Sequence, residues 1–134
     1  MNELEVVVNT LEQVAERDVD LTPLIYDEFF ESCRDAFPLM GHSDQYMRGR
    51  MVAQIFEVIM DDSLHGDGGY LGWEVNAHLK DYGVKEEMYN AFLASIKHAV
   101  KVTIDDLWQK EHDMAWDTRI EQILTAIKRH APTH

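Results

Sequence analysis

The chain has only one cysteine, Cys33, among its 134 residues. A single thiol excludes an intramolecular disulfide and a zinc site built from several cysteines. No run approaches the roughly 18 consecutive apolar residues of a membrane-spanning helix. The first dozen residues lack the basic start that is typical of a secretory signal. We therefore expect a cytoplasmic protein that has no membrane partner.

Basic residues are also few. The chain has 12 Lys and Arg against 25 Asp and Glu, which gives a formal net charge of -13 at pH 7. A field of this sign repels phosphate backbones and anionic lipid surfaces. We therefore expect no nucleic-acid partner.

Glycine and proline are scarce, at 7 and 3 residues, and no alternating run rich in β-branched residues is present. These absences argue against a sheet protein. Hydrophobic residues make up 46% of the chain, which is enough for a core and argues against disorder. At this length, the composition predicts one all-α domain covering residues 1–134.

Apolar residues recur at helical spacing in several stretches that turn signals separate. We predict helices over residues 2–17, 23–37, 44–61, 73–82, 85–101 and 105–129. Thr22 with Pro23 is a start signal for the second helix, and Ser43 or Asp44 is one for the third. Residues 38–44 are expected to form a corner. Residues 61–72 contain four glycines and form the clearest loop.

Four stretches of the chain follow one another in an informative order and spacing. They are LTPLIYDEFFESCRDAF, then SDQYMRGRMVAQIFEVIM, then His78 with the Gly83-Val84 corner after it, and finally the apolar residues from Ala115 to Leu124. In this order the stretches resemble the bacterial single-domain globins, which are related to the globin domain of flavohaemoglobins. The resemblance covers most of residues 21–127. It implies a globin-like three-on-three helical sandwich of about six to eight helices.

The resemblance implies haem b as cofactor, with His78 as the axial ligand of the iron, the role of the proximal histidine in globins. It also implies reversible binding of a diatomic gas, which would be dioxygen, nitric oxide or carbon monoxide. Nitric oxide dioxygenation would need a separate reductase as partner, because the chain carries no flavin or nicotinamide domain. His42 remains open as a second axial ligand, and the oligomeric state remains open between monomer and homodimer.

Tyr26 is the second candidate. The resemblance implies that its phenol faces the ligand side of the haem and donates a hydrogen bond to the bound gas. Such a bond contributes ~0.5–1.5 kcal/mol, and more with a charged acceptor, so release of the gas would be slow. Gln45, Met47 and Arg50 are alternatives for the polar position beside the ligand, and Met51 is expected over the iron.

The other candidates are apolar or aromatic side chains that the resemblance implies around the haem. They are Phe37, Met47, Met51, Ile55, Tyr82, Val84, Tyr89 and Phe92. An apolar stripe at helical spacing also builds an ordinary core. These residues therefore indicate a pocket only in combination with His78.

Two alternatives stay open. One is a haem-less globin-like sensor or interaction module. It is favoured by Glu74, at a position where an apolar residue is expected, and by the methionines at positions 47 and 51. Methionine-rich surfaces suit the binding of an apolar ligand or a partner helix. The second alternative is an acidic helical bundle unrelated to globins.

Overall fold

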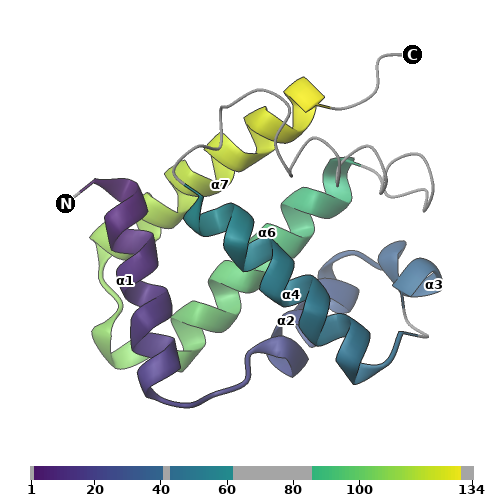
Figure 1. Cartoon of the computed structure of the whole chain (residues 1–134), viewed down its shortest axis with the longest axis horizontal. Helices are drawn as coiled ribbons and strands as arrows, with labels where there is room; N and C mark the ends of the chain where they lie inside the picture. The colour runs from purple at the N-terminus through teal and green to yellow at the C-terminus, as the bar shows by residue number, and fades with distance from the viewer. Residues whose placement is uncertain (1, 41–42, 62–85, 131–134) are drawn as a thin grey trace.

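The computed structural model describes residues 2–40, 43–61 and 86–130. Over these residues the chain forms six α-helices and one short 3-10 helix, with no strand (Figure 1). The all-α prediction is confirmed, and the number of helices is consistent with a globin-like fold. None of the helices in the described ranges combines the length and the apolar character that a membrane crossing requires.

The helices follow one another with short connections where the chain is described. They are α1 (Glu3–Glu16), α2 (Thr22–Ser32), α3 (Ala36–Met40), α4 (Gln45–Met60), α6 (Glu86–Thr103), η1 (Asp105–Leu107) and α7 (Lys110–His130).

Two helices begin where the sequence predicts, because a short polar side chain caps each of them. The side chain of Asn2 accepts a hydrogen bond from the backbone N–H of Glu5 at 2.9 Å. The side chain of Asp44 accepts one from the backbone N–H of Met47 at 2.8 Å. Each cap pairs an amide that has no partner within its own helix.

Two predicted boundaries are wrong. The second helix ends at Ser32, and the expected corner contains the short helix α3 instead, in which Pro38 lies within the first turn, where its missing N–H costs little. The last helix begins at Lys110, because Trp108 has an extended backbone after η1. His112 Nδ1 accepts a hydrogen bond from the N–H of Gln109 at 2.8 Å and supports this later start.

The core lies where α1 packs against α7 and α2 packs against α6, with α6 and α7 also in contact. In Figure 1, α4 crosses in front of α6, and the end of α4 lies near α7. The largest fully buried side chains come from all these helices, and they include Trp116, Tyr26, Ile25, Ile59, Leu93 and Ile96. The part of the core between α1 and α7 and the part between α2 and α6 differ in the hydrogen-bond partners of their buried polar atoms.

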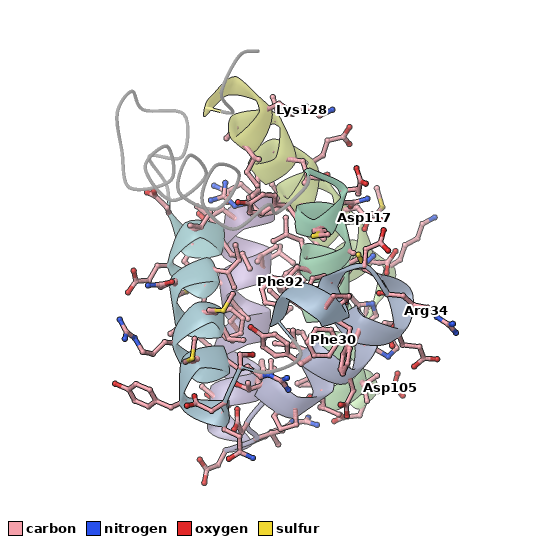
Figure 2. The ribbon with its side chains drawn as sticks, turned by 90° about the vertical axis from the view of Figure 1, so that its right-hand side faces the viewer. Phe30, Arg34, Phe92, Asp105, Asp117 and Lys128 are labelled. Carbon is pink, nitrogen blue, oxygen red and sulfur yellow. The ribbon has the colours of Figure 1, made fainter. Side chains whose placement is uncertain are left out.

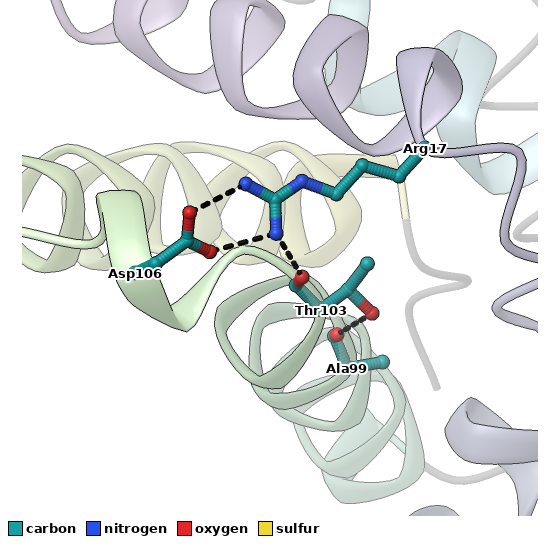
Figure 3. Close-up of polar contacts among 4 residues, drawn as sticks. All are labelled: Arg17, Ala99, Thr103 and Asp106. Carbon is teal, nitrogen blue, oxygen red and sulfur yellow. Dashed lines mark hydrogen bonds and ion pairs between the residues drawn. The ribbon is translucent and has the colours of Figure 1, made fainter.

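A polar contact joins the end of α1 to the end of α6 (Figure 3). Asp18, with φ of 54°, turns the chain out of α1 in the left-handed region that aspartate tolerates. Arg17 donates hydrogen bonds to both carboxylate oxygens of Asp106, at 2.7 and 2.8 Å, and to the carbonyl of Thr103 at 2.9 Å. The pair is exposed, so it orients this corner more than it stabilises the fold.

Candidate functional site: an aromatic cluster between α2, α4 and α6

An aromatic cluster lies between α2, α4 and α6, and we call it the Tyr26 cluster. Helix α2 contributes Tyr26, Phe29 and Phe30, whose spacing brings them to one side of the helix. Helix α6 contributes Phe92, which is labelled with Phe30 in Figure 2 and whose ring contacts those of Tyr26 and Phe29. Tyr26 is only 1% exposed, and Phe29 is also buried. The cluster is therefore part of the core, with a polar atom inside it.

The rings of the Tyr26 cluster meet mainly edge to face. The ring centroids of Tyr26 and Phe92 are 5.6 Å apart, and those of Phe29 and Phe92 are 5.0 Å apart, both in T-shaped pairs. Phe30 extends the cluster to the exposed Phe37 of α3, at 5.3 Å between centroids. Such pairs contribute about 0.5–1.5 kcal/mol each beyond the area that they bury. The contacts therefore hold the Tyr26 ring in one orientation.

The hydroxyl of Tyr26 has a weak hydrogen-bond partner. It donates to Met51 Sδ on α4 at 3.6 Å. A thioether is a poor acceptor, and a buried hydroxyl without a good acceptor costs about 1–3 kcal/mol. The hydroxyl would gain from exchanging the sulfur for a better acceptor. It is therefore a buried donor whose acceptor in the structure is weak.

Burial raises the pKa of Tyr26 to about 12, and the nearby positive charge of Arg48 opposes this rise. The desolvated phenolate is the form that burial disfavours. At neutral pH the phenol therefore keeps its proton and acts as a donor.

Arg48 is the cation of the Tyr26 cluster, and sequence reasoning missed it. Its guanidinium carbon lies 5.0 Å from the ring centroid of Tyr26 and 5.1 Å from that of Phe30. Its Nε donates a hydrogen bond to Ser43 Oγ at 2.9 Å. The spacing from Met51, one helical turn later, was the signal that could have identified it.

Arg50, one of the three alternatives for the polar position beside the ligand, lies elsewhere. It is exposed, and its guanidinium carbon lies 5.9 Å from the ring centroid of Tyr46. Gln45, the other polar alternative, is also exposed, and so is Met47 at 52%. The structure therefore does not bring any of these three side chains to the Tyr26 hydroxyl.

The remaining predicted residues divide into three groups. Ile55 and Tyr89 are half-buried and pack against the core, as Phe92 does. Phe37 is 58% exposed and reaches the cluster only through Phe30. His78, Tyr82 and Val84 lie outside the described residues, and so does His42. The iron ligand therefore stays a prediction.

Within the described ranges, no group of three or more His, Cys, Asp and Glu side chains is arranged to hold a metal ion. A separate groove of about 420 Å³ lies over α2, α6 and α7, and its lining includes Glu28, Lys97, His98, Asp113 and Asp117. Lys97 Nζ lies 2.6 Å from a carboxylate oxygen of Asp117 and 3.0 Å from one of Asp113. Among the residues predicted to contact haem, none of those that the structure describes lines this polar groove.

Comparison of the chain with protein-family models finds no match, and comparison with curated proteins finds none either.

Proposed function

We propose that this protein binds haem b with His78 as the iron ligand and reversibly binds a diatomic gas on the side of Tyr26. The gas would be dioxygen, nitric oxide or carbon monoxide. The observation that carries the proposal is the buried Tyr26 hydroxyl, whose hydrogen-bond partner is a thioether rather than an oxygen. We further propose a cytoplasmic location and a monomer or homodimer.

The side chains beside this hydroxyl are apolar, as in a haem site, but they contact one another in the structure, so haem would have to separate Phe92 and Met51 from Tyr26. Met51 presents sulfur and Phe92 presents aromatic surface beside the phenol. Apolar lining with a few well-placed polar groups is typical of cofactor sites. The apolar surface beside a single buried hydroxyl is what supports haem here.

When bound, haem would supply the iron centre at which the gas is held. The chain's own contribution is the phenol of Tyr26. The phenol, whose pKa burial raises to about 12, is protonated at neutral pH, as an ordinary tyrosine also is, and it can therefore donate a hydrogen bond. A donor fixed before the ligand arrives gives up little conformational entropy on binding, which strengthens the contact.

Nitric oxide dioxygenation is the enzymatic form of the same proposal. In that reaction nitric oxide, dioxygen and one electron give nitrate. The electron would come from a separate reductase as partner. The net charge of -13 favours a reductase with a basic docking face.

The test is a haem titration of the purified protein, followed by absorption spectra of the ferric and ferrous forms with and without carbon monoxide. We expect a Soret band that shifts on reduction and again with carbon monoxide. His78→Ala should lose this spectrum. His98→Ala, which removes an exposed histidine on α6, should keep it. A wild-type protein that develops no Soret band, or a His78→Ala variant with the wild-type spectrum, contradicts the proposal.

A second candidate is a haem-less sensor or interaction module. Phe37, Tyr46 and Met47 are large hydrophobic side chains that stay exposed around the connection from α3 to α4. Exposed apolar patches are typical of surfaces that bind a partner or an apolar ligand. This candidate predicts a colourless protein whose melting temperature rises with a fatty acid or a partner helix and is unchanged by haem.

A further inference from the structure

Three aliphatic side chains stay exposed at the corner where α1 ends, α2 begins and α6 ends. They are Val19 in the connection from α1 to α2, Leu24 in the first turn of α2 and Val102 near the end of α6. Each keeps 41–53% of its surface exposed. Single exposed aliphatic residues are ordinary, but a group of them on one surface is typical of a binding site.

Arg17 brings the segments of Val19 and Val102 together (Figure 3). It donates hydrogen bonds to the carbonyl of Thr103 at 2.9 Å and to both carboxylate oxygens of Asp106. Val19 lies two residues after Arg17, and Val102 directly precedes Thr103. The two valines therefore belong to one corner of the molecule although they are distant in the chain.

Leu24 belongs to the same side of the molecule, because α2 packs against α6. Glu28 Oε2 on α2 lies 3.9 Å from His98 Nε2 on α6. Leu24 lies one turn before Glu28, and Val102 lies one turn after His98, so each shares a helix face with one member of this pair. The exposed aliphatic residues therefore border the line along which α2 and α6 meet.

Carboxylates surround these aliphatic side chains. Asp18 and Asp20 lie in the connection from α1 to α2, and Asp105 begins η1 just after α6; all three are exposed. Over residues 17–28 and 101–107 the chain has six acidic side chains against two basic ones. Apolar surface with a negative rim favours a partner that is apolar at its centre and positive at its edges.

We propose that this corner binds a basic amphipathic helix of a partner protein. We call the binding surface the corner surface, and it consists of Val19, Leu24, Val102, Asp18, Asp20 and Asp105. The apolar stripe of the partner helix covers the aliphatic side chains, and lysines or arginines on both sides of the stripe face the carboxylates. None of the six residues is predicted to contact haem, so the inference goes beyond the proposed function and does not rest on it.

Other occupants fit the charges of the corner surface less well. A two-fold interface between two copies of the chain would place the same acidic rim on both sides, and like charges that face each other oppose association. Membrane surfaces that carry anionic lipids repel the rim as well. A fatty acid brings a carboxylate of its own. A partner with positive charges is the occupant that the carboxylates attract.

The corner surface is fixed before any partner arrives. Arg17 ties the end of α1 to the end of α6. Asp18, with φ of 54°, makes the turn out of α1. The side chain of Asp20 accepts a hydrogen bond from the backbone N–H of Thr22 at 3.0 Å, which holds the start of α2. Because these contacts exist already, binding requires little further ordering of the protein.

The first experiment follows the amide resonances of the protein without haem while a synthetic helix is added. The probe is an amphipathic peptide of about 18 residues with a leucine stripe between lysines, a length at which a helix can form. We expect the largest shifts at residues 17–24 and 98–107. The same peptide with glutamate in place of every lysine should produce no shifts. Shifts spread evenly over the surface, or centred on another region, overturn the inference.

The second experiment removes the apolar part of the corner surface. Leu24→Ser combined with Val102→Ser should weaken peptide binding at least about tenfold, because two aliphatic side chains no longer bury area in the complex. Met60→Ser is the matched control, since Met60 on α4 is exposed to the same fraction as Leu24, and it should bind as the wild type does. Thermal unfolding establishes that the variants are folded. Unchanged binding by the double variant contradicts the proposal.

The third experiment removes the carboxylates. Together, three substitutions should weaken peptide binding about three- to tenfold at physiological salt and reduce its salt dependence. They are Asp18→Asn, Asp20→Asn and Asp105→Asn. A control with the same net charge carries three changes at exposed positions elsewhere, Glu31→Gln, Glu57→Gln and Glu121→Gln. Equal weakening in both triple variants would show attraction to the acidic chain as a whole, and the corner surface would lose its role.

Sedimentation velocity distinguishes the remaining occupant, a second copy of the chain. A wild-type dimer that dissociates when Leu24 and Val102 are replaced would place that second copy on the corner surface and overturn the inference. None of these measurements needs haem. A wild-type protein that takes up no haem therefore contradicts only the proposed function, while the peptide titrations still decide what the corner surface binds.

Discussion

Two buried aromatic side chains with a polar tip, Trp116 and Tyr26, are paired in different ways. Trp116 is 0% exposed, and its Nε1 donates to Thr10 Oγ1 at 2.9 Å. The hydroxyl of Thr10 in turn donates to the carbonyl of Val7 at 2.6 Å. Tyr26 is equally buried, but its hydroxyl donates to sulfur at 3.6 Å. The indole N–H therefore has an oxygen acceptor, whereas the phenol O–H has only a sulfur acceptor.

Arg119 on α7, like Trp116, is a buried donor with oxygen acceptors. It is buried, and it donates hydrogen bonds to the carbonyls of Ile59 at 2.8 Å and Asp61 at 2.6 Å. These carbonyls lie at the C-terminal end of α4, where a helix lacks partners for its last carbonyls and a cation is favourable. The buried donors of α7, Trp116 and Arg119, therefore have strong oxygen acceptors, and we call this part of the core the structural side. The weak sulfur acceptor belongs to Tyr26, between α2, α4 and α6, on the side that we propose as functional.

The largest expected effect comes from the structural side. Arg119→Leu should lower the free energy of unfolding by about 3 kcal/mol, because hydrogen bonds to a charged group contribute about 1.5–3 kcal/mol each and buried carbonyls lose their partner. Urea denaturation measures the change, with the exposed Arg34→Leu as control. A loss no larger than that of the control would mean that water replaces the guanidinium. The hydrogen bonds of Arg119 would then not distinguish the structural side of the core from the side of Tyr26.

Thr10→Val should lower the free energy of unfolding by about 1–3 kcal/mol, because it leaves the indole N–H of Trp116 buried without its acceptor at nearly constant volume. Thr118→Val on the exposed face of α7 is the matched control and should change stability little. Thermal and urea unfolding of both variants give the comparison. Equal stability of the two would break the contrast between Trp116 and Tyr26.

A smaller effect is expected where Lys97 pairs with Asp113. The hydrogen bond from Lys97 holds the pKa of the Asp113 carboxyl below its usual value. A carboxyl whose pKa is lower in the folded state stabilises the fold above its unfolded pKa and loses this contribution as pH falls through the folded value. Because Asp113 is partly exposed, Asp113→Asn should cost less than about 1 kcal/mol at pH 7.

The difference between Asp113→Asn and wild type should shrink as pH falls below about 4, where the unfolded carboxyl becomes protonated. Urea titrations at pH 7 and at acid pH measure it. A difference that stays constant with pH would show that the pair has no linked titration.

The smallest effect is expected for Tyr26→Phe. Because the hydroxyl has only a thioether acceptor, its removal should change the free energy of unfolding by less than about 0.5 kcal/mol, or stabilise the protein. Tyr46→Phe, at an exposed position, serves as control. A cost above that of Thr10→Val would show a strong partner for the phenol and would contradict the contrast between Trp116 and Tyr26.

Much of the fold could be predicted because its signals are local. The helix over residues 2–17 is observed as Glu3–Glu16, and the one over 44–61 as Gln45–Met60. In both, apolar periodicity and a capping side chain agree. The start of α7 was missed because η1 and the extended backbone of Trp108 precede it, and the hydrogen bond from Gln109 N–H to His112 Nδ1 that supports this start leaves no signal in the apolar periodicity.

The haem site stays a prediction. Tyr26, Met51 and Phe92, which were expected around the haem, lie together in the structure, because each belongs to an apolar stripe that must face the core. Arg48, whose guanidinium lies on the rings, was not among the three alternatives for the polar position, whereas Arg50, about half a turn of helix away, was. Arg48 and Arg50 are the same residue type on the same predicted helix. The sequence therefore does not show which guanidinium contacts the rings and which is exposed to solvent.

By itself the sequence determined an acidic all-α chain, the start of two helices and the stripe that carries Tyr26, since apolar periodicity and short-range caps depend on neighbours within a few residues. Only the tertiary structure decided which acceptor each buried donor receives and which arginine reaches the phenol. Those choices depend on how α2, α4 and α6 pack, and the atoms that meet there are distant in the chain.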